Sequence, residues 1–363
     1  MPNKKILLAG GGTGGHVLPL VAVARALKKL NPETKIYFVG PEEFSLDCLR
    51  AEGVIIKKII AAGKIRRYFS FLYLWELIKL PWAFLQSLLI VATINPDAVL
   101  GKGSYGSVLP VLAAKFFGKK IILHESDTAP GLANRFLSRF ADHIALAFQE
   151  TKPYFESQTS EITVVGNPVR TRYLNLTKSE AEDVLNFRTG KQTIFISGGS
   201  QGAQKINNII LQTLDRLLAE YSVIWSVGPN NYSNVKHRVS NIPDLRTAPL
   251  LNEQELAAAY ILCDIAIGRA GAGTIFELAA FGKPSILIPL ERKGGDQPLN
   301  AQVYADAGAT TILKESELTS ESLLNTINTV LSNNNLLTQM SQKAQKFAKI
   351  EAGEQLAQML LNL

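Results

Sequence analysis

Gly10-Gly11-Gly12-Thr13-Gly14-Gly15 follows directly after the apolar run Lys5–Ala9 and precedes a segment of helical periodicity. Glycine tolerates positive φ angles and lets a ligand approach the backbone closely. The helix behind such a loop points free N–H groups and the positive end of its dipole at the loop, and this arrangement binds anions, most often phosphate. The stretch therefore predicts a strand, a phosphate-binding loop and a helix.

A second loop of this kind, Gly198–Ala203, follows the apolar run Thr193–Ser197 in the other half of the 363-residue chain. This chain length favours two domains, and two copies of one loop type predict two similar domains that face a shared cleft. Gly, Asn and Pro cluster at 166–168 and mark the boundary. We expect one domain over 1–165, a second over 166–340, and a closing helix, 341–363, that packs back on the first.

Short strand-like runs alternate with helical periodicity along most of the chain. This pattern predicts parallel sheets with helical crossovers, in doubly wound α/β domains. The expected strands are Lys5–Ala9, Lys35–Val39, Ala98–Gly101, Lys120–His124, His143–Ala147, Thr163–Val165, Thr193–Ser197, Ser222–Val227, Ile265–Gly268, Ser285–Pro289 and Thr311–Leu313. One uninterrupted helix is expected over Leu337–Leu361.

The net charge of +7 favours anionic partners, namely phosphates and acidic lipid surfaces. Nucleic acid is disfavoured because the basic residues form no block and aromatic RNA-binding motifs are missing. Cys48 and Cys263 show no metal-ligand spacing and fit a reducing compartment. The sequence has no Asp-x-Asp pair. Helix N-termini, glycine N–H groups and cations would therefore hold a diphosphate, and we expect neither a metal site nor a cofactor.

The spacing Gly10-x-Gly12-x-x-Gly15 also satisfies the dinucleotide fingerprint. A nicotinamide site needs an acidic residue at the end of the second strand, about 20 residues further on. Here Gly40-Pro41 ends that strand, and Glu42 and Glu43 come late. The pattern therefore favours another phosphate ligand over NAD. A purely structural turn is less favoured still, because five glycines cost backbone entropy.

Two further polar segments follow strands in the first half. Gly101–Ser107 is a glycine-rich loop with a lysine and hydroxyls, and it is interpreted either as the second half of a phosphate site or as an ordinary connection. His124–Asn134 begins at the carboxyl end of a strand, where α/β sheets bind ligands, although Ser126 or Asp127 would also serve as a helix N-cap. His16, at a helix N-terminus, is expected to be neutral and to act as a base, or only to hydrogen-bond the loop.

A third small-residue loop, Arg269–Thr274, joins a strand to a helix in the second half. Glu277 in that helix would accept two ribose hydroxyls, or merely complement the helix dipole. The amides of Gln297 and Asn300 suit sugar hydroxyls.

The stretch from Lys64 to Leu85 mixes basic and aromatic residues, which is typical of a segment that lies on an anionic membrane. The alternative is a core helix under the sheet, and we expect 84–94 to be that. The apolar run is broken by Glu76, Lys79 and Pro81, so no membrane span is expected. The residues expected to contact the membrane are Arg66, Arg67, Phe71, Leu74, Trp75, Ile78 and Trp82.

Taken together, the motifs resemble the MurG family of N-acetylglucosaminyltransferases. The resemblance depends on Gly10–Pro19, His124-Glu125, Gly166–Arg170, Gly198–Ala203, Arg269-Ala270-Gly271 with Glu277, and Asp296-Gln297 with Asn300-Ala301. It implies a GT-B fold and a peripheral enzyme on the cytoplasmic face of the bacterial membrane, with roles in peptidoglycan synthesis, cell shape and division. Its substrates would be UDP-N-acetylglucosamine and undecaprenyl-pyrophosphoryl-N-acetylmuramoyl-pentapeptide.

The resemblance also implies roles for individual residues. The C-terminal domain would bind UDP and the N-terminal domain the acceptor diphosphate. Our own hypothesis for the reaction is a direct, inverting displacement, with His16 as the first candidate base and Glu125 as the second. The donor site would comprise Thr13, Gly14, Gly15, Asp127, Arg170, Ser200, Leu250, Leu251, Ala270, Gly271, Ala272, Gly273, Thr274, Glu277, Asp296, Gln297 and Asn300. The acceptor diphosphate would meet Gly11, Gly12, Lys102, Gly103, Ser104 and Tyr105.

The chain departs from the family pattern at two places. Ser126-Asp127 stands where many members have Gln-Asn, so Asp127 would accept but not donate a hydrogen bond. Lys102-Gly103-Ser104 stands where a glycine pair is common, and the lysine would add charge near the acceptor. Three rival interpretations remain: a UDP-sugar epimerase, a nucleotide-sugar or lipid-phosphate binding protein, and a transferase that acts on another lipid such as diacylglycerol.

Overall fold

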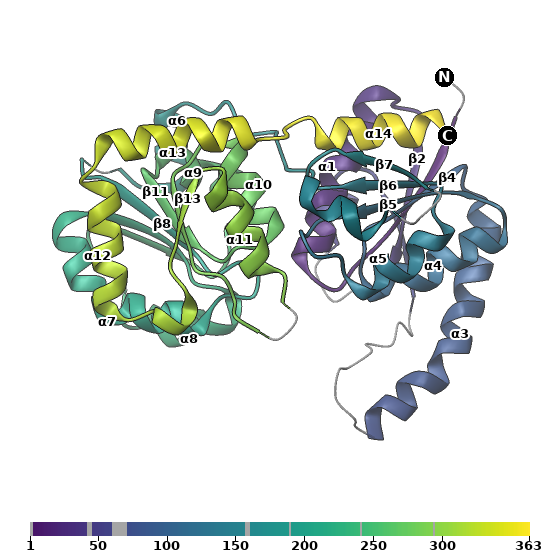
Figure 1. Ribbon diagram of the computed structural model, residues 1–363, viewed down its shortest axis with the longest axis horizontal. Coiled ribbons are helices and arrows are strands. Elements are labelled where there is room, and N and C mark those ends of the chain that lie inside the picture. The colour runs from purple at the N-terminus through teal and green to yellow at the C-terminus, as the bar shows by residue number, and fades with distance from the viewer. Residues whose placement is uncertain are drawn as a thin grey trace. The chain divides into compact units, whose positions relative to one another are not determined.

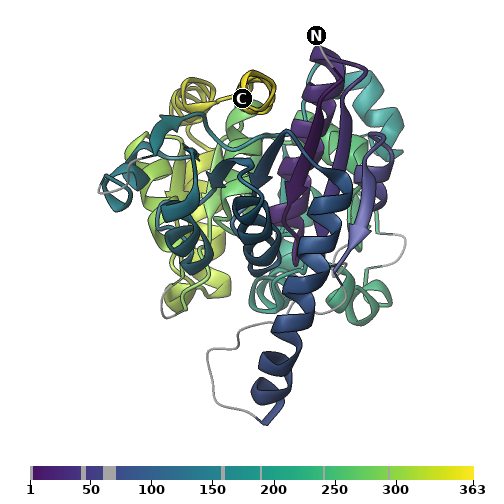
Figure 2. The same ribbon diagram turned by 90° about the vertical axis from the view of Figure 1, so that its right-hand side faces the viewer.

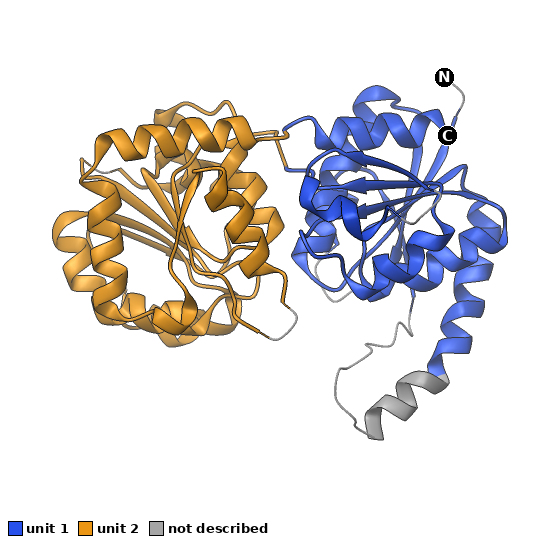
Figure 3. Ribbon diagram, in the orientation of Figure 1, with its two compact units in different colours: residues 1–169, 350–363 blue, residues 170–349 orange. Residues whose placement is uncertain are grey.

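The computed structural model describes residues 3–41, 46–59, 71–156, 160–188, 190–239, 242–292 and 295–363, and for 71–78 it describes the backbone alone. The chain forms two compact units (Figure 3). Unit 1 comprises residues 1–169 with 350–363, and unit 2 comprises 170–349.

Unit 1 contains a parallel sheet of seven strands in the order β3-β2-β1-β4-β5-β6-β7 (Figure 1). Its strands are β1 (Lys5–Ala9), β2 (Lys35–Gly40), β3 (Ile55–Lys58), β4 (Ala98–Gly101), β5 (Lys120–Glu125), β6 (His143–Leu146) and β7 (Glu161–Val164). Its helices are α1 (Gly14–Leu30), α2 (Asp47–Arg50), α3 (Phe71–Ile94), α4 (Tyr105–Phe116), α5 (Leu132–Leu137) and α14 (Ala352–Asn362), with 3-10 turns at Ser138–Phe140 and Gln149–Tyr154.

Unit 2 contains a parallel sheet of six strands in the order β10-β9-β8-β11-β12-β13. Its strands are β8 (Thr193–Ser197), β9 (Ser222–Ser226), β10 (Leu245–Ala248), β11 (Ile265–Gly268), β12 (Ser285–Leu287) and β13 (Thr310–Ile312). Its helices are α6 (Lys178–Leu185), α7 (Gln204–Glu220), α8 (Pro229–Lys236), α9 (Glu253–Leu262), α10 (Ala272–Ala280), α11 (Gln297–Asp306), α12 (Ser320–Leu331) and α13 (Asn334–Phe347), with a 3-10 turn at Glu315–Glu317.

Both sheets are covered by helices on both faces, and alternate residues of each strand enter opposite cores. In unit 1, α1 and α14 cover one face of the sheet, and α3 and α4 cover the other (Figures 1 and 2). On β1, Ile6 and Leu8 pack with α1 and α14, whereas Leu7 and Ala9 pack with α3 and α4. On β8, Ile194 and Ile196 pack with α7 and α12, and Phe195 packs with α9 and α10. The predicted class, two doubly wound α/β domains, is confirmed.

Two features differ from the sequence predictions. The strands β3 and β10 were not predicted, because both are short edge strands that carry charged residues. The prediction of a single closing helix was wrong, since α13 ends at Phe347 and α14 begins at Ala352. The break lets α14 pack closely on α1, where a Cβ on Gly353 would lie 3.4 Å from the Ala22 carbonyl oxygen.

Candidate active site

The strand order of each sheet reverses at one point. In unit 1, β2 and β4 lie on opposite sides of β1, and in unit 2, β9 and β11 lie on opposite sides of β8. Open α/β sheets bind ligands at the carboxyl ends of the strands beside such a switch point. The loops after β1, β4, β8 and β11 occupy these positions, and all four are glycine-containing loops that the sequence had singled out.

The helices behind these four loops begin without a capping side chain. The N-caps of α1, α4, α7 and α10 make no side-chain hydrogen bond, and no acidic residue lies in their first turns. Elsewhere in the described residues, α6, α9 and α12 begin with a complete capping box, whereas α5, α8 and α14 also lack a side-chain cap. A cap is worth about 0.5–2 kcal/mol to a helix. The helices at the switch points therefore keep N–H groups for an anion.

The loops after β1 and β4 pack against each other in unit 1. Gly11 and Gly12 have φ angles of +127° and +95°, which side chains rarely adopt. A Cβ on Gly12 would lie 3.1 Å from the Tyr105 ring, and the Lys102 N–H donates to the Ala9 carbonyl at 2.8 Å. The structure thus brings most of the predicted acceptor residues together.

The predicted donor-sugar residues on the first loop differ in exposure. Thr13 and Gly15 are exposed, whereas Gly14 is buried. Of the other acceptor residues, Ser104 is buried, and a Cβ on Gly103 would lie 2.4 Å from the Asn134 amide. Gly103 therefore has to be glycine on steric grounds as well as for its φ of +67°.

His16 begins the first full turn of α1 beside this loop. Removal from water is the largest cause that lowers the pKa of its imidazole to about 4, and the positive charge of Lys102 lowers it further. The ring is hydrogen-bonded to the Lys102 backbone. Its buried Nδ1 has no hydrogen-bond partner in the described part of the chain. The expected neutral imidazole is therefore present, with a nitrogen that the protein leaves to a ligand.

Glu125, the second candidate base, ends β5 in a buried position. Burial raises the pKa of its carboxyl to about 7, and the neighbouring Asp127 adds to the effect. Both oxygens accept hydrogen bonds: from the Asp127 N–H at 3.0 Å, from the Gly131 N–H at 3.1 Å and from the Asn134 amide at 3.0 Å. A carboxylate with three donors on it holds the segment 125–134 in place.

In unit 2, the loop after β8 is shaped by close backbone contacts. A Cβ on Gly202 would lie 2.6 Å from the Val227 carbonyl oxygen, and one on Gly198 would lie 2.3 Å from the Ala203 nitrogen. Gly199 faces open space, and Ser200 beside it is partly exposed. The loop before α7 is therefore tight where it meets the sheet and open where a ligand would approach.

Arg170 and Glu277, predicted to contact the donor phosphates and ribose, form an ion pair in unit 2. Arg170 Nη2 lies 3.2 Å from Glu277 Oε1, and the two side chains are 11% and 19% exposed. The Tyr260 hydroxyl donates to Glu277 Oε2 at 3.4 Å. The carboxylate thus reaches the guanidinium from α10 and is positioned by α9.

The loop after β11 is braced from α11. Asn300 is fully buried, and its amide donates to the Ala270 carbonyl at 3.4 Å. The Gln297 side-chain oxygen accepts from the Leu290 N–H at 2.9 Å. These two amides, expected to contact sugar hydroxyls, thus hold loop backbone.

The remaining donor-site residues lie at the N-termini of α10 and α11 and after β10. A Cβ added at Gly271 or Gly273 would meet no atom of the described residues within 4 Å. Of the residues expected beside uracil, Leu250 is exposed, whereas Leu251 is buried in the core. Ala272 is buried, Thr274 is partly exposed, and Asp296 is the N-cap of α11.

Sequence reasoning missed three residues that hold the candidate groups. Asn134 anchors Glu125, Tyr260 anchors Glu277, and Glu315 pairs with Arg269 at the end of β11. Asn134 lies in the segment 124–134 but had no predicted role, Tyr260 and Glu315 belong to no motif, and each of the three is separated from its partner by nine residues or more. The sequence carries no local signal for such pairs.

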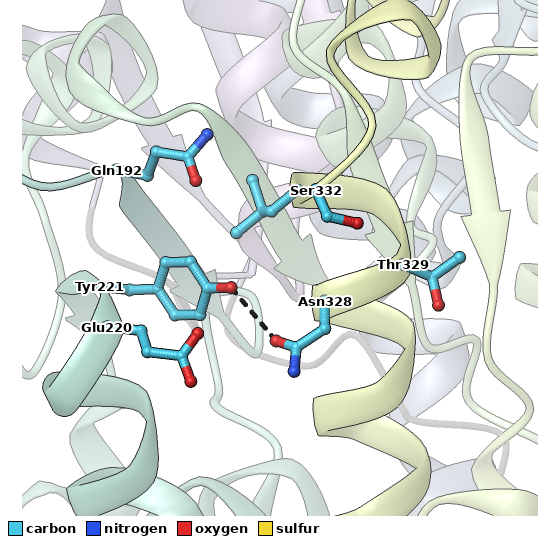
Figure 4. A pocket seen from close by; sticks show the side chains of 7 residues that line it. Gln192, Glu220, Tyr221, Asn328, Thr329 and Ser332 are labelled. Carbon is cyan, nitrogen blue, oxygen red and sulfur yellow. Dashed lines mark hydrogen bonds between the residues drawn. The ribbon is translucent and has the colours of Figure 1, made fainter.

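A shallow cavity of about 650 Å³ lies at the other edge of the second sheet. Gln192 and Tyr221 line it just before β8 and β9, and the Tyr221 hydroxyl donates to the Asn328 side chain at 3.1 Å (Figure 4). Since these residues precede the strands, the cavity is opposite the loops described above and is not part of the candidate site.

Comparison with known proteins identifies the family. The glycosyltransferase family 28 N-terminal domain matches residues 6–146, and the family 28 C-terminal domain matches residues 193–356. A curated relative from Thermoanaerobacter sp. (strain X514) is 35% identical over 99% of this chain and 100% of its own length. It is named UDP-N-acetylglucosamine–N-acetylmuramyl-(pentapeptide) pyrophosphoryl-undecaprenol N-acetylglucosamine transferase. The chain belongs to the MurG family. It is therefore a glycosyltransferase, as the sequence motifs predicted.

Other relatives and solved structures agree with this assignment. A transferase of the same name from Clostridium perfringens is 35% identical over 90% of each chain. The crystal structure of Acinetobacter baumannii MurG superposes with a TM-score of 0.73 at 27% identity, over 99% of this chain and 100% of that one. A UDP-GlcNAc 2-epimerase from Neisseria meningitidis has a TM-score of 0.71 over 99% of this chain and 100% of its own, but at 16% identity it shares the fold alone.

Proposed function

We propose that the chain transfers N-acetylglucosamine from UDP-N-acetylglucosamine to the muramoyl 4-hydroxyl of undecaprenyl-pyrophosphoryl-N-acetylmuramoyl-pentapeptide, with inversion at the anomeric carbon. The observation that carries this proposal is that the four helices that begin beside the switch points, α1 and α4 in unit 1 and α7 and α10 in unit 2, all start without a side-chain cap, on a chain of this family. The donor and the acceptor each contain a diphosphate. Each unit has one pair of these helix N-termini, which can bind one diphosphate.

Unit 2 is the proposed site of the nucleotide. The N-termini of α7 and α10 and the Arg170 guanidinium would stabilise the charge that grows on UDP as it leaves. Glu277 would accept hydrogen bonds from the ribose with the oxygen that Tyr260 positions. The contacts of Thr13, Gly14, Gly15 and Asp127 with the donor sugar stay predictions, as do those of Asp296, Gln297 and Asn300.

Unit 1 is the proposed site of the acceptor. The N–H groups at the starts of α1 and α4 would hold its diphosphate near Gly11, Gly12 and Tyr105. His16 is the proposed base that removes the proton from the attacking hydroxyl. It is favoured over Glu125 because its Nδ1 has no partner among the residues that the structure describes, whereas both oxygens of Glu125 already accept hydrogen bonds.

We further propose that α3 rests on the cytoplasmic face of the membrane. Arg66 and Arg67 lie outside the described residues, as do the side chains of Phe71, Leu74, Trp75 and Ile78. In the described part of α3, Trp82, Leu85 and Leu89 form one exposed stripe, with Trp82 71% exposed. Ala83, Ser87 and Val91 on the opposite face are buried, so the expected core helix over 84–94 is only half correct.

A basic residue lies beside this stripe. The Gln86 amide donates to the Lys58 carbonyl at 3.2 Å, which places the end of β3 beside α3, and the exposed Lys57 is on the same face of the strand as Ile59, which packs with α3. Apolar side chains with adjacent lysines suit an anionic lipid surface. No helix in the described ranges is long and apolar enough to cross a bilayer.

Radiolabelled UDP-N-acetylglucosamine incubated with the monosaccharide lipid tests the transfer. A labelled disaccharide lipid is the expected product, and its absence would overturn the proposal. A parallel reaction with diacylglycerol tests the alternative lipid, and one without any lipid tests the epimerase, which would alter the free UDP-sugar.

Sedimentation with vesicles tests the membrane contact. The chain should bind vesicles that contain anionic lipid more tightly than neutral ones. Trp82→Gln with Leu89→Gln should weaken binding by about tenfold or more, because each side chain contributes about 1.5–3 kcal/mol when buried. Tyr154→Gln, an exposed aromatic of the same unit away from α3, is the matched control. Equal binding by all variants would contradict the contact.

A further inference from the structure

Lys102 is a buried cation at the centre of a polar cluster in unit 1. Its side chain is 2% exposed. The Nζ atom lies 2.7 Å from His124 Nδ1 and 3.1 Å from Asn167 Oδ1, and it also donates to the Ser126 hydroxyl. An ammonium has three donors and no acceptor. Each of its N–H groups therefore meets one acceptor, and the cluster joins the loop after β4 to β5 and to Asn167.

The His124 ring is held in one tautomer by this cluster. Its Nε2 lies 2.9 Å from the Gly166 carbonyl oxygen, which can only accept, so Nε2 carries the proton and Nδ1 accepts from Lys102. His124 is fully buried, and burial together with the Lys102 charge lowers the pKa of its imidazole. The ring stays neutral beside the ammonium.

Lys102 also carries charge that offsets two carboxylates. Glu125 and Asp127 both attract its ammonium, while burial lowers its pKa to about 7. The Asp127 N–H donates to Glu125 Oε1 at 3.0 Å, so the two acids belong to one turn. Buried charges are costly unless they are paired. The titratable groups that face one another here are His16 from α1, Lys102 after β4, His124 and Glu125 from β5, and Asp127 after it.

The same residue holds the candidate base through its backbone, because the His16 ring is hydrogen-bonded there. We propose that Lys102 is a positioning residue of the transfer reaction, whose ammonium fixes the His124 ring and Asn167 and offsets the charge of Glu125 and Asp127. The two departures from the common family pattern, at Lys102 and at Ser126-Asp127, then form one compensated arrangement. The inference rests on the proposed transfer reaction.

Lys102→Met keeps the length of the side chain and removes its charge. The pKa of His16 should rise because a like charge is lost, and that of Glu125 should rise because an opposite charge is lost. Whichever group acts as base, the acidic limb of the kcat/KM profile should therefore move to higher pH, by about half a unit or more. We expect kcat to fall about tenfold or more, with little change in the donor KM.

Two companion variants separate charge from packing. Ser126→Ala removes one acceptor and keeps the charge, so its acidic limb should stay at the wild-type pH. Lys102→Met with Asp127→Asn removes one charge of each sign. If the acidic limb of this double variant returns to the wild-type pH, the proposal is supported and the limb is assigned to Glu125. If the limb stays at the higher pH of Lys102→Met, the proposal is supported and the limb is assigned to His16.

A wild-type limb in Lys102→Met, or an equal shift in Ser126→Ala, would overturn the proposal. If circular dichroism shows that Lys102→Met is not folded, Asp127→Asn in the wild-type background decides instead. Its acidic limb should move to lower pH, because a negative charge beside the site is lost, and an unmoved limb would overturn the charge balance. A failure of the proposed transfer reaction itself would look different from a failure of this inference, because the wild-type chain would then form no product.

Discussion

Gly271→Asp should stabilise the protein and weaken its donor site at the same time. Gly271 is the N-cap of α10, with φ −69°, and a Cβ there would meet nothing within 4 Å. An Asp at an N-cap stabilises a helix by about 1 kcal/mol, which raises the melting temperature by about 2–4 °C in a unit of this size. The same carboxylate would lie where the UDP diphosphate is proposed to bind.

Its effect on binding follows from Coulomb's law. At about 5 Å and an effective dielectric constant of about 20–40, two like charges repel by about 2–3 kcal/mol, or about 20- to 200-fold in affinity. Calorimetry with UDP and a thermal melt of the same sample measure the two effects. Thr177→Asp, at the capped start of α6, is the matched control and should leave UDP affinity unchanged. Unchanged UDP affinity in Gly271→Asp would refute the assignment of α10 as a phosphate site.

Four further results are expected. Gly40→Ala should lower kcat by about a hundredfold. The new Cβ would lie 1.9 Å from the Gly10 carbonyl oxygen, so the loop after β1 must move by about 1 Å. Wild-type kinetics in this variant would contradict the prediction. His16→Ala should lower kcat about a hundredfold or more with UDP affinity near normal, and a barely changed kcat would exclude it as the base. Glu277→Gln should raise the donor KM about tenfold and lower the melting temperature, because it leaves Arg170 without its charged partner. Because the pKa of Glu125 is raised to about 7, the folded chain keeps the Glu125 proton up to about that pH, whereas the unfolded chain releases it near pH 4.5. Its contribution to stability therefore falls as pH rises from about 4.5 to 7, and Glu125→Gln should flatten that part of a plot of melting temperature against pH.

Local patterns in the sequence were sufficient to predict the fold class and the loops at the switch points. The apolar run before Gly10 and the helix after it are properties of adjacent residues, and the same holds at Gly198 and Gly271. The family motifs then supplied the substrates. Short edge strands such as β3 lack this signal, because one face and one edge meet solvent and polar residues are tolerated there.

The contacts that hold the site could not be predicted in this way. Lys102 lies 65 residues from Asn167 in sequence, and Arg170 lies 107 residues from Glu277. Such pairs form only because parallel strands bring their carboxyl ends to one edge of a sheet. The sequence suggested that Lys102 adds charge for the acceptor, whereas the structure shows its ammonium bonded to His124, Ser126 and Asn167.

The fold cannot separate a transferase from an epimerase, because both classes superpose on this chain about equally well. The content of unit 1 is what separates them. An epimerase that acts on one UDP-sugar has a single diphosphate to bind. Here uncapped helix N-termini also follow β1 and β4, beside a neutral histidine whose Nδ1 has no partner among the described residues, and the same unit exposes an apolar stripe next to a lysine. The proposed second anion site, base and lipid-facing helix in one unit are what an acceptor that is both a diphosphate and a lipid would require.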